Sequence, residues 1–274
     1  MKNKYFTIAM GLKPIAIVAS KKGRNILFFA LVFALILITP FTTLKAQNIK
    51  VAIAANLQPV MKALQKDFKA KTGINVDAIS GPSGNLTTQI ENGAPFDVFL
   101  SADTAFPDEL FKSGFATNKP VVYAAGTLII CSTEKLDLGN WPKLLPGTSV
   151  QKIAIGNPAI APYGKAAQEA LTKAGIYEMV QAKIVLGESI TQVNTYITTG
   201  VVQAGFTTLA LVKDAANKTQ LYYKIIDPKT YNPIKQGMVL IKQPKPNPGA
   251  EKFYRYILSP AAKKIFINYG YHVN

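Results

Sequence analysis

Hydrophobic and polar residues fall into alternating blocks from position 49 onward. The run at 49–55 is apolar except for Lys50, as in a mostly buried strand. The segment that follows, 57–73, has apolar residues three or four positions apart, the spacing of one helix face, and it ends at Gly73. Because this order of strand and helix recurs along the chain, the pattern predicts an α/β fold with mostly parallel strands.

The same periodicities place the remaining elements. Further strands are predicted at 74–80, 96–102, 127–133, 152–157, 182–187, 204–210, 221–227 and 237–242. Further helices are predicted at 85–93, 104–114, 164–175, 190–200 and 249–270. The order of elements changes near residues 126 and 206, which are candidate crossovers between two lobes. We therefore expect residues 47–125 and 207–274 to form lobe I and residues 126–206 to form lobe II.

The first 46 residues differ from the rest of the chain. They contain seven basic residues and no acidic one, then an unbroken apolar run at 26–38, then Ala46 as a small residue at a cleavage point. This run is shorter than the roughly 20 apolar residues that a membrane span needs. Residues 1–46 are therefore predicted to be a signal peptide, with an uncleaved anchor as the alternative. No cysteine lies near the cleavage point, which argues against a lipid anchor.

Without this leader the chain has 24 basic and 15 acidic residues, a net charge of +9. A positive surface attracts anions of any size and speeds the encounter with a small anionic ligand. No stretch interleaves aromatic and basic residues as single-strand binding surfaces do, so a nucleic-acid partner is not expected.

Few residues are available for catalysis or for metal binding. The chain has one histidine, His272, and one cysteine, Cys131, which cannot supply a zinc cluster or an internal disulfide. The serine of Gly81-Pro82-Ser83-Gly84 does not form a nucleophile elbow, because Asn85 stands where that motif has glycine. No P-loop string occurs. We expect neither a catalytic residue nor a cofactor.

Four predicted helices begin directly after a strand. These junctions lie at Asn56, at Ser83, near Gly164 and at Ile190, two in each lobe. Each presents free backbone N–H groups and the positive end of a helix dipole, and such junctions gather at the carboxyl edge of an α/β sheet. Together they form a candidate anion site. Taken singly, Asn56, Ser83 and Ser189 are also ordinary helix N-caps.

Four segments contain these junctions. They are VAIAANLQPVMKALQKDFKAKTG, SGPSGNLTTQIENGAPFDVFLSAD, IGNPAIAPYGKAAQEAL and VLGESITQVNTYITTGVVQAGF. In order and spacing they resemble the periplasmic molybdate-binding proteins of ABC importers. The resemblance extends from about residue 49 to the end of the chain, and GAPFDVFLSAD and NPAIAPYGKAA are its most specific parts.

The resemblance implies a two-lobed type II periplasmic binding protein fold, with a mixed, mostly parallel sheet in each lobe and a ligand cleft between the lobes. It implies an exported, periplasmic, monomeric protein that is not an enzyme. Such a protein captures molybdate or tungstate and delivers it to the membrane permease of an ABC transporter. The residues that the resemblance assigns to the oxyanion are Asn56, Ser83, Tyr163 and Ile190, with Ala55 and Thr208 as further candidates.

Two positions depart from patterns common in the family. Some members have a tyrosine donor where this chain has Thr208, whose side chain reaches less far. The GSSG of many members is GPSG here, which keeps only the second serine, Ser83.

A cage of neutral donors suits a fully ionised oxyanion that must be released again, because a buried ion pair adds a desolvation cost. Molybdate and tungstate are larger tetrahedra than sulfate, so a cage fitted to them leaves its donors out of reach of the smaller ion. Two alternatives remain open from the sequence. One is a binding protein for another tetrahedral oxyanion such as sulfate, and the other is an extracytoplasmic enzyme on the same scaffold.

Overall fold

The computed structural model describes residues 48–273, which contain two five-stranded sheets. The predicted signal peptide, residues 1–46, lies outside the described residues. No helix within 48–273 is both long enough and apolar enough to cross a membrane. The two sheets belong to one compact unit, Ala46–Asn274, and define its lobe I and lobe II.

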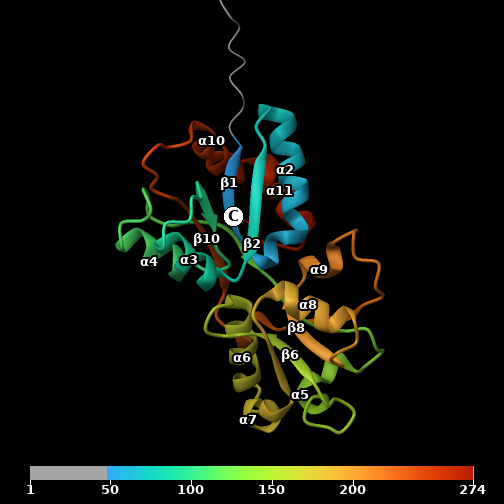
Figure 1. Cartoon of the computed structure of the whole chain (residues 1–274). Helices are drawn as coiled ribbons and strands as arrows, with labels where there is room; N and C mark the ends of the chain where they lie inside the picture. Colours follow the sequence, from blue (N-terminus) through green and yellow to red (C-terminus); the bar gives the residue numbers. More distant parts are fainter. Residues whose placement is uncertain (1–47, 274) are drawn as a thin grey trace, which may run out of the picture. The chain divides into compact units, whose positions relative to one another are not determined.

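Lobe I is built around a sheet with the strand order β2-β1-β3-β10-β4. Its strands are β1 (Ile49–Ala54), β2 (Val76–Gly81), β3 (Val98–Leu100), β4 (Val121–Gly126) and β10 (Ile234–Leu240). Its helices are η1 (Ala55–Leu57), α2 (Gln58–Thr72), α3 (Ser83–Glu91), α4 (Ala105–Lys112), α10 (Pro248–Ile257) and α11 (Pro260–Asn268), most of which are labelled in Figure 1. Only β10 runs against the other four strands.

Lobe II repeats this plan with the strand order β7-β6-β8-β5-β9. Its strands are β5 (Leu128–Ser132), β6 (Ile153–Gly156), β7 (Ile184–Gly187), β8 (Ala204–Thr208) and β9 (Tyr222–Ile225). The helices between them are η2 (Leu138–Asn140), α5 (Trp141–Leu144), α6 (Pro162–Lys173), α7 (Tyr177–Val180), η3 (Gln181–Lys183), α8 (Ile190–Thr198) and α9 (Ala210–Lys213), and η4 (Pro228–Thr230) follows β9. Only β5 is reversed, so both sheets are mixed and mostly parallel, as predicted.

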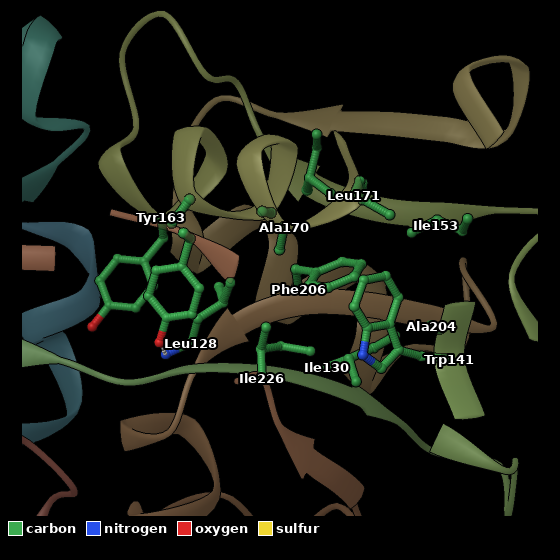
Figure 2. Close-up of a cluster of buried hydrophobic side chains, with 14 of the residues drawn as sticks. Leu128, Ile130, Trp141, Ile153, Tyr163, Ala170, Leu171, Ala204, Phe206 and Ile226 are labelled. Atoms are coloured by element: carbon green, nitrogen blue, oxygen red, sulfur yellow. Dashed lines mark hydrogen bonds between the residues drawn. The ribbon is translucent and has the colours of Figure 1, made fainter. Parts of the chain in front are cut away.

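Both faces of the inner strands β1, β3, β5, β6 and β8 are buried, which explains why most of their residues are apolar. In lobe I, Val51 and Ile53 of β1 pack with residues of α2, α10 and α11, whereas Ala52 packs with residues of α3 and α4. Side chains alternate across a strand, so a strand covered on both faces is apolar at every position. Figure 2 shows one core layer of lobe II, where Trp141 meets Phe206 edge-to-face and Tyr163 lies at one end.

The chain crosses between the lobes twice. The first crossing joins β4 to β5 at residues 126–128. The second joins β9 to β10, so the predicted return to lobe I at residue 207 is wrong. Thr208 of β8 pairs with Leu128 of β5, and β9 pairs with the other edge of β5, which keeps both strands in lobe II. Lobe II is therefore a continuous insertion in lobe I.

Other elements also differ from the sequence prediction, among them the short helices α5, α7 and α9, which were not predicted. Strand β4 was not predicted. The predicted closing helix 249–270 is two helices, α10 and α11, because Pro260 cannot continue a helix and instead occupies the first position of α11. Ser259 caps that new start by accepting a hydrogen bond from the backbone N–H of Ala262.

Candidate functional site

A small cavity lies where helix starts from both lobes meet. Its volume is about 10 Å³. It is lined by Ala54, Ala55, Asn56, Pro82, Ser83, Ala102, Ala161, Pro162, Tyr163 and Ile190. None of these side chains carries a charge. Because sites for organic ligands usually measure about 300–1,000 Å³, this cavity is too small for an organic molecule.

Charged residues lie close to this cavity without lining it. Asp103 and Lys165 border a neighbouring hollow that shares Ala102 and Pro162 with the cavity. Burial raises the pKa of Asp103, although the backbone N–H of Phe106 donates a hydrogen bond to its carboxylate. No group of three or more His, Cys, Asp and Glu side chains able to hold a metal ion occurs within residues 48–273. The cavity itself offers only neutral groups.

The first junction follows from the parallel pairing of β1 and β2, which end opposite each other and so deliver their next residues to the same edge of the sheet. Asn56 lies in η1 and is 1% exposed. Its Nδ2 donates to Gln236 Oε1 at 3.0 Å and to the Tyr271 hydroxyl at 3.2 Å. Asn56 is not a helix cap, because Leu57 is the N-cap of α2. Its polar side chain is therefore free for another role.

Ser83 is the first residue of α3, and Pro82 holds the N-cap position without a side-chain bond. The capping interpretation of Ser83 is therefore wrong. Its Oγ instead accepts a hydrogen bond from the backbone N–H of Ala102 at 3.1 Å. Both residues line the cavity. Since the Ala102 N–H occupies a lone pair of the oxygen, the hydroxyl proton of Ser83 is left to donate to a ligand.

The counterpart in lobe II is the start of α6. Pro162 takes the first helical position, where no N–H is needed, and Tyr163 takes the second. Because Tyr163 lies in the first turn, no carbonyl one turn earlier in the helix accepts a hydrogen bond from its N–H. The helix lies very close to β6 here, because a Cβ on Gly164 would stand 2.0 Å from the carbonyl oxygen of Gly156. Glycine at 164 thus fixes where the start of α6 lies.

The fourth junction is the start of α8 at Ile190. Ser189 is the N-cap, and its Oγ accepts from the backbone N–H of Gln192 at 3.2 Å, so this predicted cap is confirmed. The N–H of Ile190 belongs to the first turn and has no intrahelical partner. The positive ends of α3, α6 and α8 therefore meet at one cavity, where they stabilise a small anion without a cation.

The side chain of Tyr163 extends from the cavity toward the crossings between the lobes. Its hydroxyl accepts from Thr208 Oγ1 at 3.2 Å and from Gln236 Nε2 at 3.4 Å. Burial raises the pKa of Tyr163 well above its usual value, so the hydroxyl stays neutral. A Cβ on Gly126 would stand 2.0 Å from this oxygen, which makes Gly126 necessary for the arrangement.

The structure thus brings five of the six predicted residues to the cavity and places the sixth, Thr208, behind Tyr163. A role for Gln236 was not predicted from the sequence. No local motif marks this residue, because it lies 180 positions from Asn56 and 73 positions from Tyr163.

Besides the bond between Gln236 and Tyr163, two further hydrogen bonds join the lobes beside the cavity. The backbone N–H of Gly84 in α3 donates to the carbonyl of Ile160, just before α6, at 3.1 Å. Thr191 Oγ1 of α8 donates to Gln58 Oε1 of α2 at 2.9 Å. A Cβ on Gly84 would stand 3.2 Å from the backbone of Ile160, so the two chains are in close contact. The lobes are closed on each other around the cavity.

Comparison with known proteins gives consistent results. The family model described as bacterial extracellular solute-binding protein matches residues 49–272. The molybdate-binding protein ModA of Azotobacter vinelandii is 34% identical over 228 residues, which cover 83% of this chain and 90% of that protein. The solved structure of the periplasmic molybdate-binding protein of Azotobacter vinelandii matches with a TM-score of 0.78 at 34% identity, covering 82% of this chain and 99% of that chain.

A more distant match shares the fold with this chain at low sequence identity. The sulfate-binding protein SubI from Mycobacterium tuberculosis H37Rv matches with a TM-score of 0.66, covering 82% of this chain and 86% of that chain, but it is 14% identical. At that identity the match shows the fold alone.

Proposed function

The chain belongs to the bacterial extracellular solute-binding proteins, and on this premise we propose that it captures molybdate or tungstate and delivers the ion to the permease of an ABC importer. The observation that carries the choice of ligand is the convergence of three helix starts and the Ser83 hydroxyl on a small cavity without a charged side chain. The similarity to molybdate-binding proteins over most of the chain supports the same choice.

The donors suit a dianion that must be bound and later released. Backbone N–H groups of Ser83, Tyr163 and Ile190 and the hydroxyl of Ser83 supply charge-assisted hydrogen bonds. A buried lysine or arginine would add a desolvation cost, and its ion pair with the anion would slow release. Neutral donors at helix ends therefore favour reversible capture.

The remaining parts of the proposal follow from this role. The protein is exported by its leader and acts as a monomer outside the cytoplasm. It binds without catalysing a reaction and needs no cofactor. The permease recognises the closed arrangement of the two lobes, in which the Gly84–Ile160 and Thr191–Gln58 contacts are formed.

Calorimetric titration of residues 47–274 with molybdate, tungstate and sulfate tests the proposal. We expect submicromolar binding of molybdate and tungstate and no binding of sulfate at the same concentrations. Tighter binding of sulfate would identify the alternative oxyanion. Failure to bind any of the three would refute the proposal and would favour the alternative of an enzyme on the same scaffold.

A further inference from the structure

Asn56 presents the wrong amide atom for an anion. Its Nδ2 donates to Gln236 and Tyr271, whereas its Oδ1 is buried and has no hydrogen-bond partner among the described residues. Because the two branches of a planar amide point apart, this oxygen is the atom left for an occupant of the cavity that Asn56 lines. An amide oxygen only accepts hydrogen bonds. A fully ionised oxyanion therefore requires the reversed amide, with Nδ2 as its donor.

Gln236 prevents Asn56 from reversing alone. If only Asn56 turned, its Oδ1 would face Gln236 Oε1 at hydrogen-bond distance with no proton between the two oxygens. Gln236 is fully buried, and its Oε1 also accepts from the Tyr123 hydroxyl at 2.9 Å, so neither side chain can turn to solvent instead. Two buried hydrogen-bond acceptors that face each other without a proton destabilise the folded protein. The two amides must reverse together.

In the reversed pair, each side-chain amide group that faces the network has a hydrogen-bond partner. Gln236 Nε2 then donates to Asn56 Oδ1 and to the Tyr123 oxygen, whose own proton goes to a backbone carbonyl 2.9 Å away. The Tyr271 hydroxyl, which donates to the carbonyl of Asn56 at 2.7 Å, can turn its proton to Oδ1. At the other end, Gln236 Oε1 takes the place of Nε2 and accepts a hydrogen bond from the Tyr163 hydroxyl. The hydrogen-bonded chain then runs from the anion to lobe II.

We propose that Gln236 is a positioning residue for oxyanion recognition, which fixes the amide atom that Asn56 presents, and that anion binding reverses both amides together. This inference rests on the proposed function. It also assigns a specificity role to Gln236. The nitrogen orientation serves a fully ionised oxyanion, and the oxygen orientation would serve one that carries a proton, such as hydrogen phosphate.

A double-mutant cycle tests the link between the two amides. Tungstate affinity is measured for the native protein, Gln236→Met, Asn56→Ala and the double variant. We expect Gln236→Met to weaken binding by at least about tenfold with Asn56 present and by less than about twofold in the Asn56→Ala background, because its effect passes through Asn56. Equal losses in both backgrounds, or no loss in either, would overturn the inference. A native protein that binds no tungstate would refute the proposed function instead.

A second measurement uses the native protein and does not depend on a variant that folds. The side-chain amide signals of Asn56 and Gln236 are followed by ¹⁵N NMR during titration with tungstate. Both signals should shift, and the proton contact between the Asn56 amide and the Tyr271 ring should be lost. Asn118, whose Nδ2 donates to the Tyr254 hydroxyl at 2.9 Å, is a matched control that should not change. A shift of Asn56 alone, or a retained contact to Tyr271, would contradict the joint reversal.

Discussion

Replacing Ser83 with alanine should affect ligand binding and stability separately. The side chain is 1% exposed, so its hydroxyl donates to the anion in a dry site. A hydrogen bond to a charged group contributes about 1.5–3 kcal/mol, which corresponds to a loss of affinity of about 10- to 150-fold. The substitution also removes the acceptor of the Ala102 N–H, and a buried N–H without a partner costs about 1–3 kcal/mol of folding free energy.

The assay pairs calorimetric titration with molybdate and thermal unfolding without ligand. Ser259→Ala is the control, because Ser259 caps α11 in lobe I and does not line the cavity. Loss of that cap costs about 1 kcal/mol of stability and should leave affinity unchanged. If Ser83→Ala lowers the melting temperature but binds molybdate as tightly as the native protein, then Ser83 only supports the Ala102 backbone and the reasoning about its proton is wrong.

The remaining predictions concern the crossing, the lobe contact, the thiol and the pH dependence. Gly126→Ala should displace the Tyr163 hydroxyl, because the new Cβ would stand 2.0 Å from its oxygen. The substitution should lower both the melting temperature and the affinity for molybdate. Native values for both would show that the contact between Gly126 and Tyr163 is not needed. Thr191→Val removes the bond to Gln58 and should speed release of molybdate by about two- to tenfold in stopped-flow measurements, and an unchanged rate would show that this contact does not hold the lobes closed. Burial raises the pKa of the Cys131 thiol from 9.0 to about 12. Because the unfolded chain loses that proton first, stability should fall as pH rises from 9.0 toward 12, and Cys131→Ala should remove this component of the denaturation profile. Molybdate affinity should be constant between about pH 6 and about pH 9, since no group lining the cavity titrates in that range, and a clear inflection in calorimetry would reveal an ionising contact.

The alternation of strands and helices was predictable because burial on both faces makes most inner strands short apolar runs. The missed strand, β4, shows the limit of that signal. Within the sheet it lies at the edge and pairs with one strand, β10, and Val121 and Val122 in it are exposed. Its pairing partner lies more than a hundred positions away. An edge strand fixed by such a distant partner leaves only a weak local pattern.

The positions of the candidate site were predictable where they depend on local sequence, at the starts of helices that follow strands. Local rules could not assign the role of each side chain. Ser83 and Ser189 have the same local features of a cap, but Pro82 displaces the first from that position while the second does cap its helix. The hydrogen bond from Ala102 to Ser83 depends on the tertiary structure, because it forms only when β2 and β3 pair with the two edges of β1.

The insertion of lobe II in lobe I has a mechanical consequence. Both ends of the described chain are anchored in lobe I, at Ile49 in β1 and at His272, which pairs with Ala125 of β4. A force applied between these ends would load the lobe I sheet directly and reach lobe II only through the two crossings. Stretching experiments should therefore show lobe I rupturing first, followed by a separate extension step as lobe II, then placed in series, is pulled apart.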